Sequence, residues 1–161
     1  MSHDIFACLE HRPRAGGPWS LLAADVAITR HYTLWAVLAG VHNYHGHTIV
    51  PIARPRGLPD DLSFATQDTF AHWERGDASD EEIAGPWRRE WGDDDPHYSY
   101  LDYAELVRAQ HIFSQIEDDV DEPLGPVRRK NGPHLDLAAI LVYLQVYEDN
   151  GFTTRMVFGF D

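Results

Sequence analysis

Cysteine and lysine are almost missing from this 161-residue chain, which contains one of each. With Cys8 as the only thiol, no disulfide can form within the chain. The apolar neighbours of Cys8 predict a buried side chain rather than a nucleophile. Arginine carries almost all of the positive charge, and its planar fork suits carboxylate or phosphate groups. A GC-rich genome, which favours Arg codons, is the alternative reason for this bias.

Long apolar runs are also lacking. The two longest cover residues 34–41 and 137–146, and both are too short to span a bilayer. The first residues, Met-Ser-His-Asp, show neither the basic nor the apolar region of a signal peptide. We therefore expect no membrane insertion and a cytoplasmic location.

The charge balance is strongly acidic, with 26 acidic and 13 basic residues and a formal net charge of −13. Such a field repels polyanions, so binding to extended nucleic acid or to anionic membranes is disfavoured. This average charge is still compatible with one small cationic pocket. The acidic clusters at 93–95 and 117–122 lack the spacing of a calcium-binding loop and are interpreted as solvated surface. The basic run at 128–130 is interpreted in the same way.

The hydrophobic pattern predicts a single α+β domain over residues 1–161. Alternating apolar residues predict strands at 4–11 and 153–160, and a further strand is expected at 19–22. Helices are expected at 33–41, 64–75, 102–118 and 135–147. Gly40 is compatible with the end of the first, Ser63 is a candidate N-cap of the second, and Asp102 with Glu105 is typical of the start of the third. Ser79 and Glu82 form a capping-box pattern. The helix at 135–147 is apolar on most sides, so we expect it to be largely buried. Together these elements predict a small antiparallel sheet that includes both terminal strands and is covered by about four helices.

Three histidines lie close together in the segment His-Asn-Tyr-His-Gly-His. They are His42, His45 and His47. Imidazole is a good ligand for zinc, nickel, copper or iron, and three such groups can converge on one ion if the loop folds around it. With a nearby carboxylate such as Asp93, this loop is a candidate site for a metal-dependent hydrolase. An exposed polar loop explains the same residues, because the spacing fits no standard metal motif.

A second candidate site is spread over three segments at the boundaries of the expected elements, where scaffolds commonly present binding groups. Its residues are Arg30, Tyr32, Arg56, His97, Ser99 and Tyr100. Arg forks can grip anionic groups, and Tyr faces can stack on a base, so a nucleotide-like anion is the expected ligand class. In the structural alternative, Arg56 pairs with a carboxylate such as Asp60 or Asp61 and the tyrosines border the core.

Several enzyme signatures are absent from the sequence. It has no glycine-rich dinucleotide or P-loop motif and no Gly-x-Ser-x-Gly. These absences do not decide whether the protein is an enzyme, because an unfamiliar site can still be catalytic. The sequence does not identify a cofactor.

The chain resembles a group of small proteins, with no established activity, that are encoded by actinobacteria and their phages. The similar segments are RHYTLWAVLAGV at 30–41, PIARPRGLPDD at 51–61, SYL at 99–101 with AEL at 104–106, and VFGFD at 157–161. The resemblance implies an accessory role, such as binding a host molecule. The chain departs from the group at Tyr100, where Trp is expected, and at Asp102, where Thr is expected. Its histidine-rich loop is longer than in the group, which argues against a shared site there.

Three functions follow from these observations. The leading hypothesis is a small-molecule binding protein for a nucleotide-like anion or signalling nucleotide, without covalent chemistry. The second is the metal-dependent hydrolase. The third is a protein–protein interaction module that uses surface aromatics such as Trp73, Trp87 and Trp91. The sequence does not indicate an oligomeric state.

Overall fold

The computed structural model describes residues 5–43, 49–75 and 98–160. Its strands are β1 (Ile5–Pro13), β2 (Ser20–Val26), β3 (Tyr98–Asp102), β4 (Glu117–Val120), β5 (Val127–Lys130) and β6 (Phe152–Phe160). Its helices are α1 (Tyr32–Ala39), α2 (Phe64–Arg75), α4 (Tyr103–Gln115) and α5 (Leu135–Glu148). The expected helix start at Ser79 lies outside the described residues.

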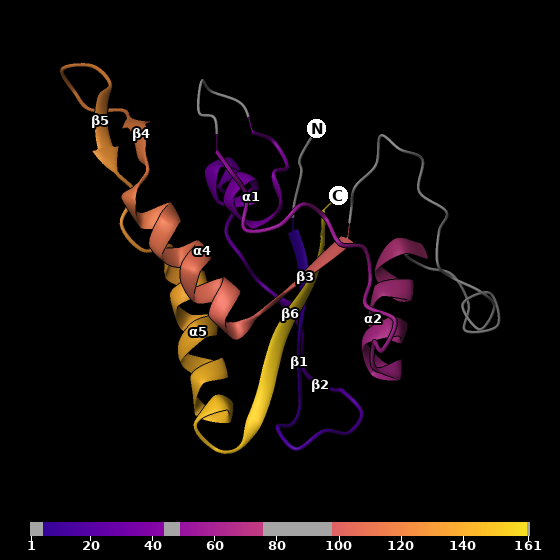
Figure 1. Ribbon diagram of the computed structural model, residues 1–161. Coiled ribbons are helices and arrows are strands. Elements are labelled where there is room, and N and C mark those ends of the chain that lie inside the picture. Colours follow the sequence, from indigo (N-terminus) through magenta and orange to yellow (C-terminus); the bar gives the residue numbers. More distant parts are fainter. Residues whose placement is uncertain (1–4, 44–48, 76–97, 161) are drawn as a thin grey trace.

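The main sheet has the strand order β2-β1-β6-β3, and every pair in it is antiparallel (Figure 1). The two terminal strands pair over their whole length, from Ile5 opposite Phe160 to Pro13 opposite Phe152. The α+β fold with both terminal strands in one antiparallel sheet is therefore confirmed. β4 and β5 form a separate two-stranded ribbon, which stands beyond one end of α4 in Figure 1.

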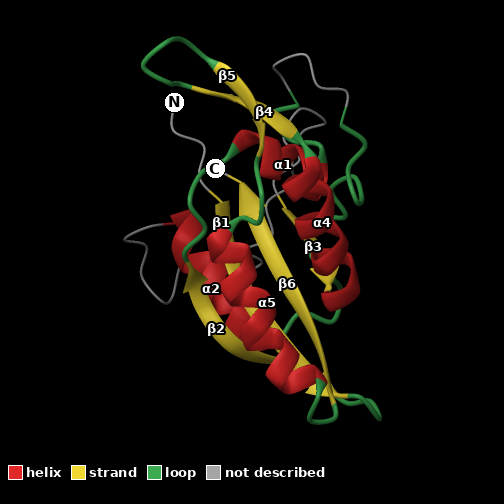
Figure 2. Ribbon diagram, turned by 90° about the vertical axis from the view of Figure 1, so that its left-hand side faces the viewer, coloured by secondary structure: helices red, strands yellow, loops and turns green. Residues whose placement is uncertain are grey.

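Side chains alternate between the two faces of the sheet, and each face has its own core. On one face, Leu9 and Phe158 pack with buried residues of α1, α4 and α5. On the other face, Cys8 and Val157 pack with Phe70 of α2. Figures 1 and 2 show the resulting layers, with α1, α4 and α5 on one side of the sheet and α2 on the other.

Local sequence signals explain where the helices begin and end. Ser63 caps α2, because its Oγ accepts a hydrogen bond from the backbone N–H of Thr66 at 3.1 Å. Asp102 and Glu105 form a reciprocal capping box at the start of α4. α1 ends at Gly40, which adopts a left-handed φ of 74° and donates its N–H to Ala36. These three boundaries were predicted from the sequence.

The prediction that the last helix is largely buried is wrong. Only one side of α5 enters the core, through Leu137, Ile140 and Leu144. Residues on the opposite side, including Leu135 and Val142, are exposed. The helix is apolar on two sides but has only one side against the sheet. Within the described residues, no helix has the length and apolar character needed to cross a membrane.

Candidate functional site

Arg56, Ser99 and Tyr100, three of the predicted ligand-binding residues, lie together at the edge strand β3. The backbone N–H of Arg56 donates to Ser99 Oγ at 3.1 Å, and Arg56 Nη1 donates to the carbonyl oxygen of Tyr100 at 3.0 Å. The Arg56 guanidinium also lies 5.5 Å from the centre of the Tyr100 ring. The loop before α2 is thus fastened to β3 at the place where a ligand was expected.

The guanidinium of Arg56 is held by a carboxylate of the same chain. Arg56 Nη1 and Nη2 donate to the two carboxylate oxygens of Glu105 at 2.8 and 2.5 Å. The hydrogen bond from Arg56 lowers the pKa of Glu105, and the same bond raises the pKa of Arg56. The partner is therefore Glu105, in the first turn of α4, and not Asp60 or Asp61. An external anion would have to displace this bidentate pair.

Tyr32 does not join this group. It begins α1 and packs against the core on the α1, α4 and α5 side, whereas Tyr100 packs against the core on the α2 side. Its ring lies 5.2 Å from that of His42. Arg30 is exposed just before α1, and His97 lies outside the described residues. The structure therefore brings together Arg56, Ser99 and Tyr100, but it separates Tyr100 from Tyr32 by the thickness of the sheet.

Tyr100 belongs to a row of alternating guanidinium groups and aromatic rings on the α2 side of the sheet. We call it the Arg–aromatic row, and in order it comprises Arg12, Trp19, Arg155, Tyr100 and Arg56. Two guanidinium groups lie over the Trp19 ring, that of Arg12 at 4.6 Å and that of Arg155 at 3.9 Å. The Arg155 guanidinium also flanks Tyr100, at 5.8 Å, and the Arg56 guanidinium flanks the same ring at 5.5 Å. Each of these contacts is close enough for a cation–π interaction.

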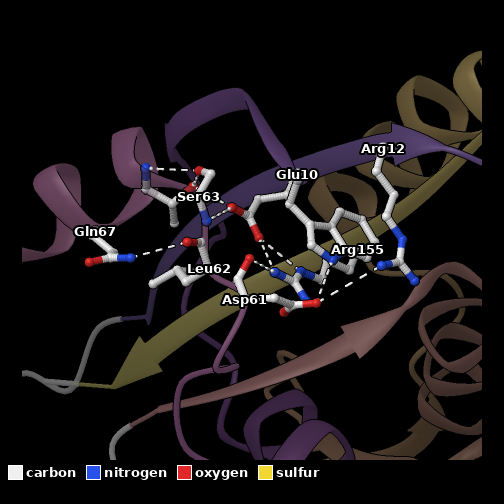
Figure 3. A network of polar contacts seen from close by, with 9 residues as sticks. Glu10, Arg12, Asp61, Leu62, Ser63, Gln67 and Arg155 are labelled. Atoms are coloured by element: carbon white, nitrogen blue, oxygen red, sulfur yellow. Dashed lines mark hydrogen bonds and ion pairs between the residues drawn. The ribbon is translucent and has the colours of Figure 1, made fainter. Parts of the chain in front are cut away.

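The centre of the row is a buried ion pair between neighbouring strands (Figure 3). Glu10 of β1 lies opposite Arg155 of β6. Glu10 Oε1 accepts a hydrogen bond from Arg155 Nε at 2.8 Å and forms an ion pair with Nη2 at 2.7 Å. The other oxygen, Oε2, accepts from the backbone N–H of Ser63 at 3.0 Å and from Thr66 Oγ1 at 2.8 Å. Both carboxylate oxygens of Glu10 thus accept hydrogen bonds, and these bonds connect the first turn of α2 to the sheet.

Asp61 extends this network to the surface. Its Oδ1 accepts from Arg155 Nη1 at 2.9 Å, and its Oδ2 accepts from Trp19 Nε1 at 3.0 Å. Burial by itself raises the pKa of Asp61, but the hydrogen bonds from Arg155 and Trp19 and the positive charge of Arg155 together outweigh it, so the pKa is lowered. The row and its partners therefore contain three guanidinium groups and three carboxylates, counting Glu105. Because these charges balance, the row is suited to fixing the loop before α2 against the sheet rather than to attracting an anion.

Sequence reasoning did not identify Glu10, Trp19 or Arg155. A usable signal was present, because Glu10 and Arg155 are residues of opposite charge inside the two terminal strands that were predicted to pair. Once the register of those strands is known, the two residues are directly opposite each other.

The predicted metal site lies mostly outside the described residues. His42 is described, and its ring lies against Tyr32, whereas His45, His47 and Asp93 are not described. In residues 5–43, 49–75 and 98–160, no group of three or more His, Cys, Asp or Glu side chains is arranged to hold a metal ion. The metal-dependent hydrolase stays a prediction.

Among the described residues, an apolar line runs along the outer side of α5. We call it the α5 stripe, and it comprises Leu135, Ala139, Val142, Tyr143 and Val146, all exposed. Their spacing of three or four residues places them on one side of the helix. Leu135 is 79% exposed, Val142 65% and Val146 57%. Leaving several large aliphatic side chains in water on one helix face is typical of an interaction surface.

The α5 stripe is held rigidly at both ends. At the N-terminal end, the side-chain amide of Gln110 in α4 donates to the carbonyl oxygen of His134 at 2.8 Å and accepts from its N–H at 3.1 Å. Asp136 accepts from the backbone N–H of Thr29 at 2.6 Å. At the C-terminal end, Glu148 accepts from the N–H and the hydroxyl of Thr154 at 2.9 and 2.8 Å. These contacts fix the helix before any partner arrives.

The tryptophans proposed as surface contacts do not provide a comparable surface. The ring of Trp73 stacks on Phe6 with 4.6 Å between centroids and also meets Phe70 and Tyr98 edge to face. It therefore completes the core on the α2 side. Trp87 and Trp91 lie outside the described residues.

Comparisons of the chain with models of protein families, with curated proteins and with solved structures found no match. The resemblance to small proteins of actinobacteria and their phages stays a prediction, and the functional argument rests on the geometry above.

Proposed function

We propose that this chain is a protein–protein interaction module that docks through the α5 stripe. The observation that carries the proposal is the exposure of Leu135, Val142 and Val146 along one side of a helix whose opposite side is fully engaged with the sheet. Burial of apolar surface is the dominant favourable term in protein association. A helix face of this kind supplies apolar surface at spacings that a partner groove or helix can match.

The chemistry of the stripe favours a protein partner over other macromolecules. It contains no charged side chain, and the chain has a formal charge of −13. Nucleic acids and anionic lipid surfaces are recognised through positive charge, which is lacking here. The hydrogen bonds at both ends of α5 also mean that little conformational entropy is lost in ordering the helix on binding.

Binding of a nucleotide-like anion is the weaker proposal. It is supported by the meeting of Arg56, Ser99 and Tyr100 at β3. It is opposed by Glu105, which already occupies two donors of the Arg56 guanidinium. An anion at this place would gain one bidentate pair only by breaking another.

Photo-cross-linking in cells tests the docking proposal. A photoreactive phenylalanine analogue is placed at Val142, in the middle of the stripe, and at Gln115 as the control, which is an exposed position of α4. We expect a covalent protein adduct of defined mass from position 142 and none from position 115. A second substitution in the stripe, Val146→Glu, should remove the adduct. If both positions give the same adducts, or if neither gives one, the stripe is not a docking surface.

A further inference from the structure

We propose that the partner of the α5 stripe is a second copy of this chain, with the two α5 helices packed antiparallel about a twofold axis. This inference rests on the proposed function, because it assumes that the stripe docks a protein. It adds the identity of the partner and the geometry of the contact. A symmetric pair needs only one kind of surface, since the same patch serves both copies.

Four of the five residues of the stripe match one another when the helix is reversed. Large side chains lie at both ends, at Leu135 and Val146, which are separated by about 16 Å along the helix. Between them lie Ala139 and Val142. A twofold axis through the middle places Leu135 opposite Val146 of the other copy and Ala139 opposite its Val142. The small Ala139 side chain lets the two backbones approach at the centre, while the larger residues fill the ends.

Charge favours this face for self-association. Two copies that each carry −13 repel each other over most of their surfaces. Between Asp136 and Glu148, however, α5 contains no charged residue. The span from Leu135 to Val146 includes one charged residue, Asp136, and the antiparallel arrangement places the two Asp136 residues at opposite ends of the contact. In the antiparallel arrangement, the N-terminus of each helix also lies beside the C-terminus of the other, which is the favourable orientation of the two helix dipoles.

The exposed area of the stripe supplies most of what a specific dimer needs. From their exposed fractions, the four large residues of the stripe present about 400 Å² of surface in each copy. A symmetric pair would bury about 800 Å² through these residues, compared with about 1,000 Å² as the lower limit of specific interfaces. Ala139, which is also exposed, and residues beside the stripe would supply the remainder.

The molar mass in solution, measured by light scattering over a range of concentrations, tests the proposal directly. The chain has a mass of 18.3 kDa, and we expect twice this value at high concentration. Val142→Glu should weaken the dimer by about 100-fold or more, because each copy would bury an unpaired carboxylate. The substitution should not unfold the monomer, since Val142 is 65% exposed and Glu forms helix more readily than Val.

Gln145→Glu is the matched control. It adds the same charge to the same helix at an exposed position, roughly 100° around the helix from the centre of the stripe. We expect this variant to remain a dimer. Equal loss of the dimer in both variants would mean that general charge repulsion is responsible, and it would overturn the proposal.

The remaining outcomes distinguish docking of a second copy from docking of another protein on the α5 stripe. If the chain is monomeric at all concentrations and photo-cross-linking at Val142 yields a different protein, the second copy is excluded while docking through the stripe stands. If a dimer forms that Val142→Glu leaves intact, the copies meet elsewhere and the inference is wrong. If the chain is monomeric and position 142 gives no adduct, both proposals fail.

Cross-linking of introduced cysteines tests whether the two α5 helices are antiparallel. Cys8 is fully buried and contributes little background, so introduced thiols can be cross-linked with a short bis-maleimide. A mixture of Leu135→Cys and Val146→Cys chains should give cross-linked dimers in high yield, whereas Leu135→Cys alone should give few. The reverse result would show parallel helices and overturn the twofold antiparallel geometry.

Discussion

Replacing Glu10 with Gln should destabilise the protein by about 3–5 kcal/mol, although the two side chains have nearly the same shape. Glu10 is completely buried, and both of its oxygens face donors. Gln has one oxygen and one NH₂ group, so its NH₂ must face either Arg155 or the pair Ser63 and Thr66. In either orientation donors face donors, and Arg155 is left with Asp61 as its carboxylate partner in a site where its side chain is only 7% exposed.

Urea unfolding, followed by circular dichroism, measures this effect, and Glu105→Gln is the matched control. Glu105 also forms a bidentate pair with an arginine, but the Arg56 side chain is 32% exposed, and Gln can replace Glu in a capping box. We expect a loss of about 1 kcal/mol or less for the control. Most domains of this kind are stable by only about 5–15 kcal/mol, so the Glu10 variant should unfold at clearly lower urea concentration. If the two variants lose the same stability, the argument from burial is incorrect.

The remaining predictions concern one exposed pair and one buried thiol. The hydrogen bond from Arg56 lowers the pKa of Glu105 below its ordinary 4.5, so the pair stabilises the fold above that pH and loses its effect as the pH falls through the lowered pKa. The stability difference between the wild type and Arg56→Met, taken from urea midpoints, should therefore narrow below about pH 4.5; a constant difference would contradict this. Burial raises the pKa of Cys8 to about 12, so a thiol reagent at pH 8 should label the native protein much more slowly than the protein in urea. Rapid labelling of the native protein would mean that β1 is not covered as described.

The sequence was informative wherever a local rule determines the structure. Alternation predicted both terminal strands, and the capping residues Ser63 and Asp102 predicted the starts of α2 and α4. The burial of Cys8 followed from its apolar neighbours. Each of these signals lies within a few residues of the feature it predicts.

The elements that were missed depend on pairing between distant segments. β3 is only five residues long and leads directly into a helix, so its pairing with β6 gives no clear local signal. β4 and β5 were interpreted as solvated acidic and basic runs. In the structure they form a ribbon in which Glu117 lies opposite Lys130 and Asp118 opposite Arg129. Opposite charges directly across two strands stabilise their pairing, and this complementarity was visible in the sequence only if the two runs were compared.

Contacts between distant segments also explain why anion binding at Arg56 and Tyr100 became the weaker proposal. Arg56 and Tyr100 were singled out because their side chains can bind a ligand, but whether such groups are available depends on what the fold places beside them. Glu105 comes from a segment about fifty residues beyond Arg56 and satisfies it internally.

The α5 stripe presents the opposite case. An apolar sequence on both sides of a helix predicts burial on both sides, and the chain itself covers only the side that faces the sheet. Polar groups in the Arg–aromatic row meet partners within the chain, whereas Leu135, Val142 and Val146 remain in water. Burial of apolar surface at α5 can therefore still stabilise an association, whereas the arginines already have partners within the chain. Such burial requires a surface from outside the chain. The position of the exposed apolar residues therefore argues for association as the function, and the reactive side chains do not.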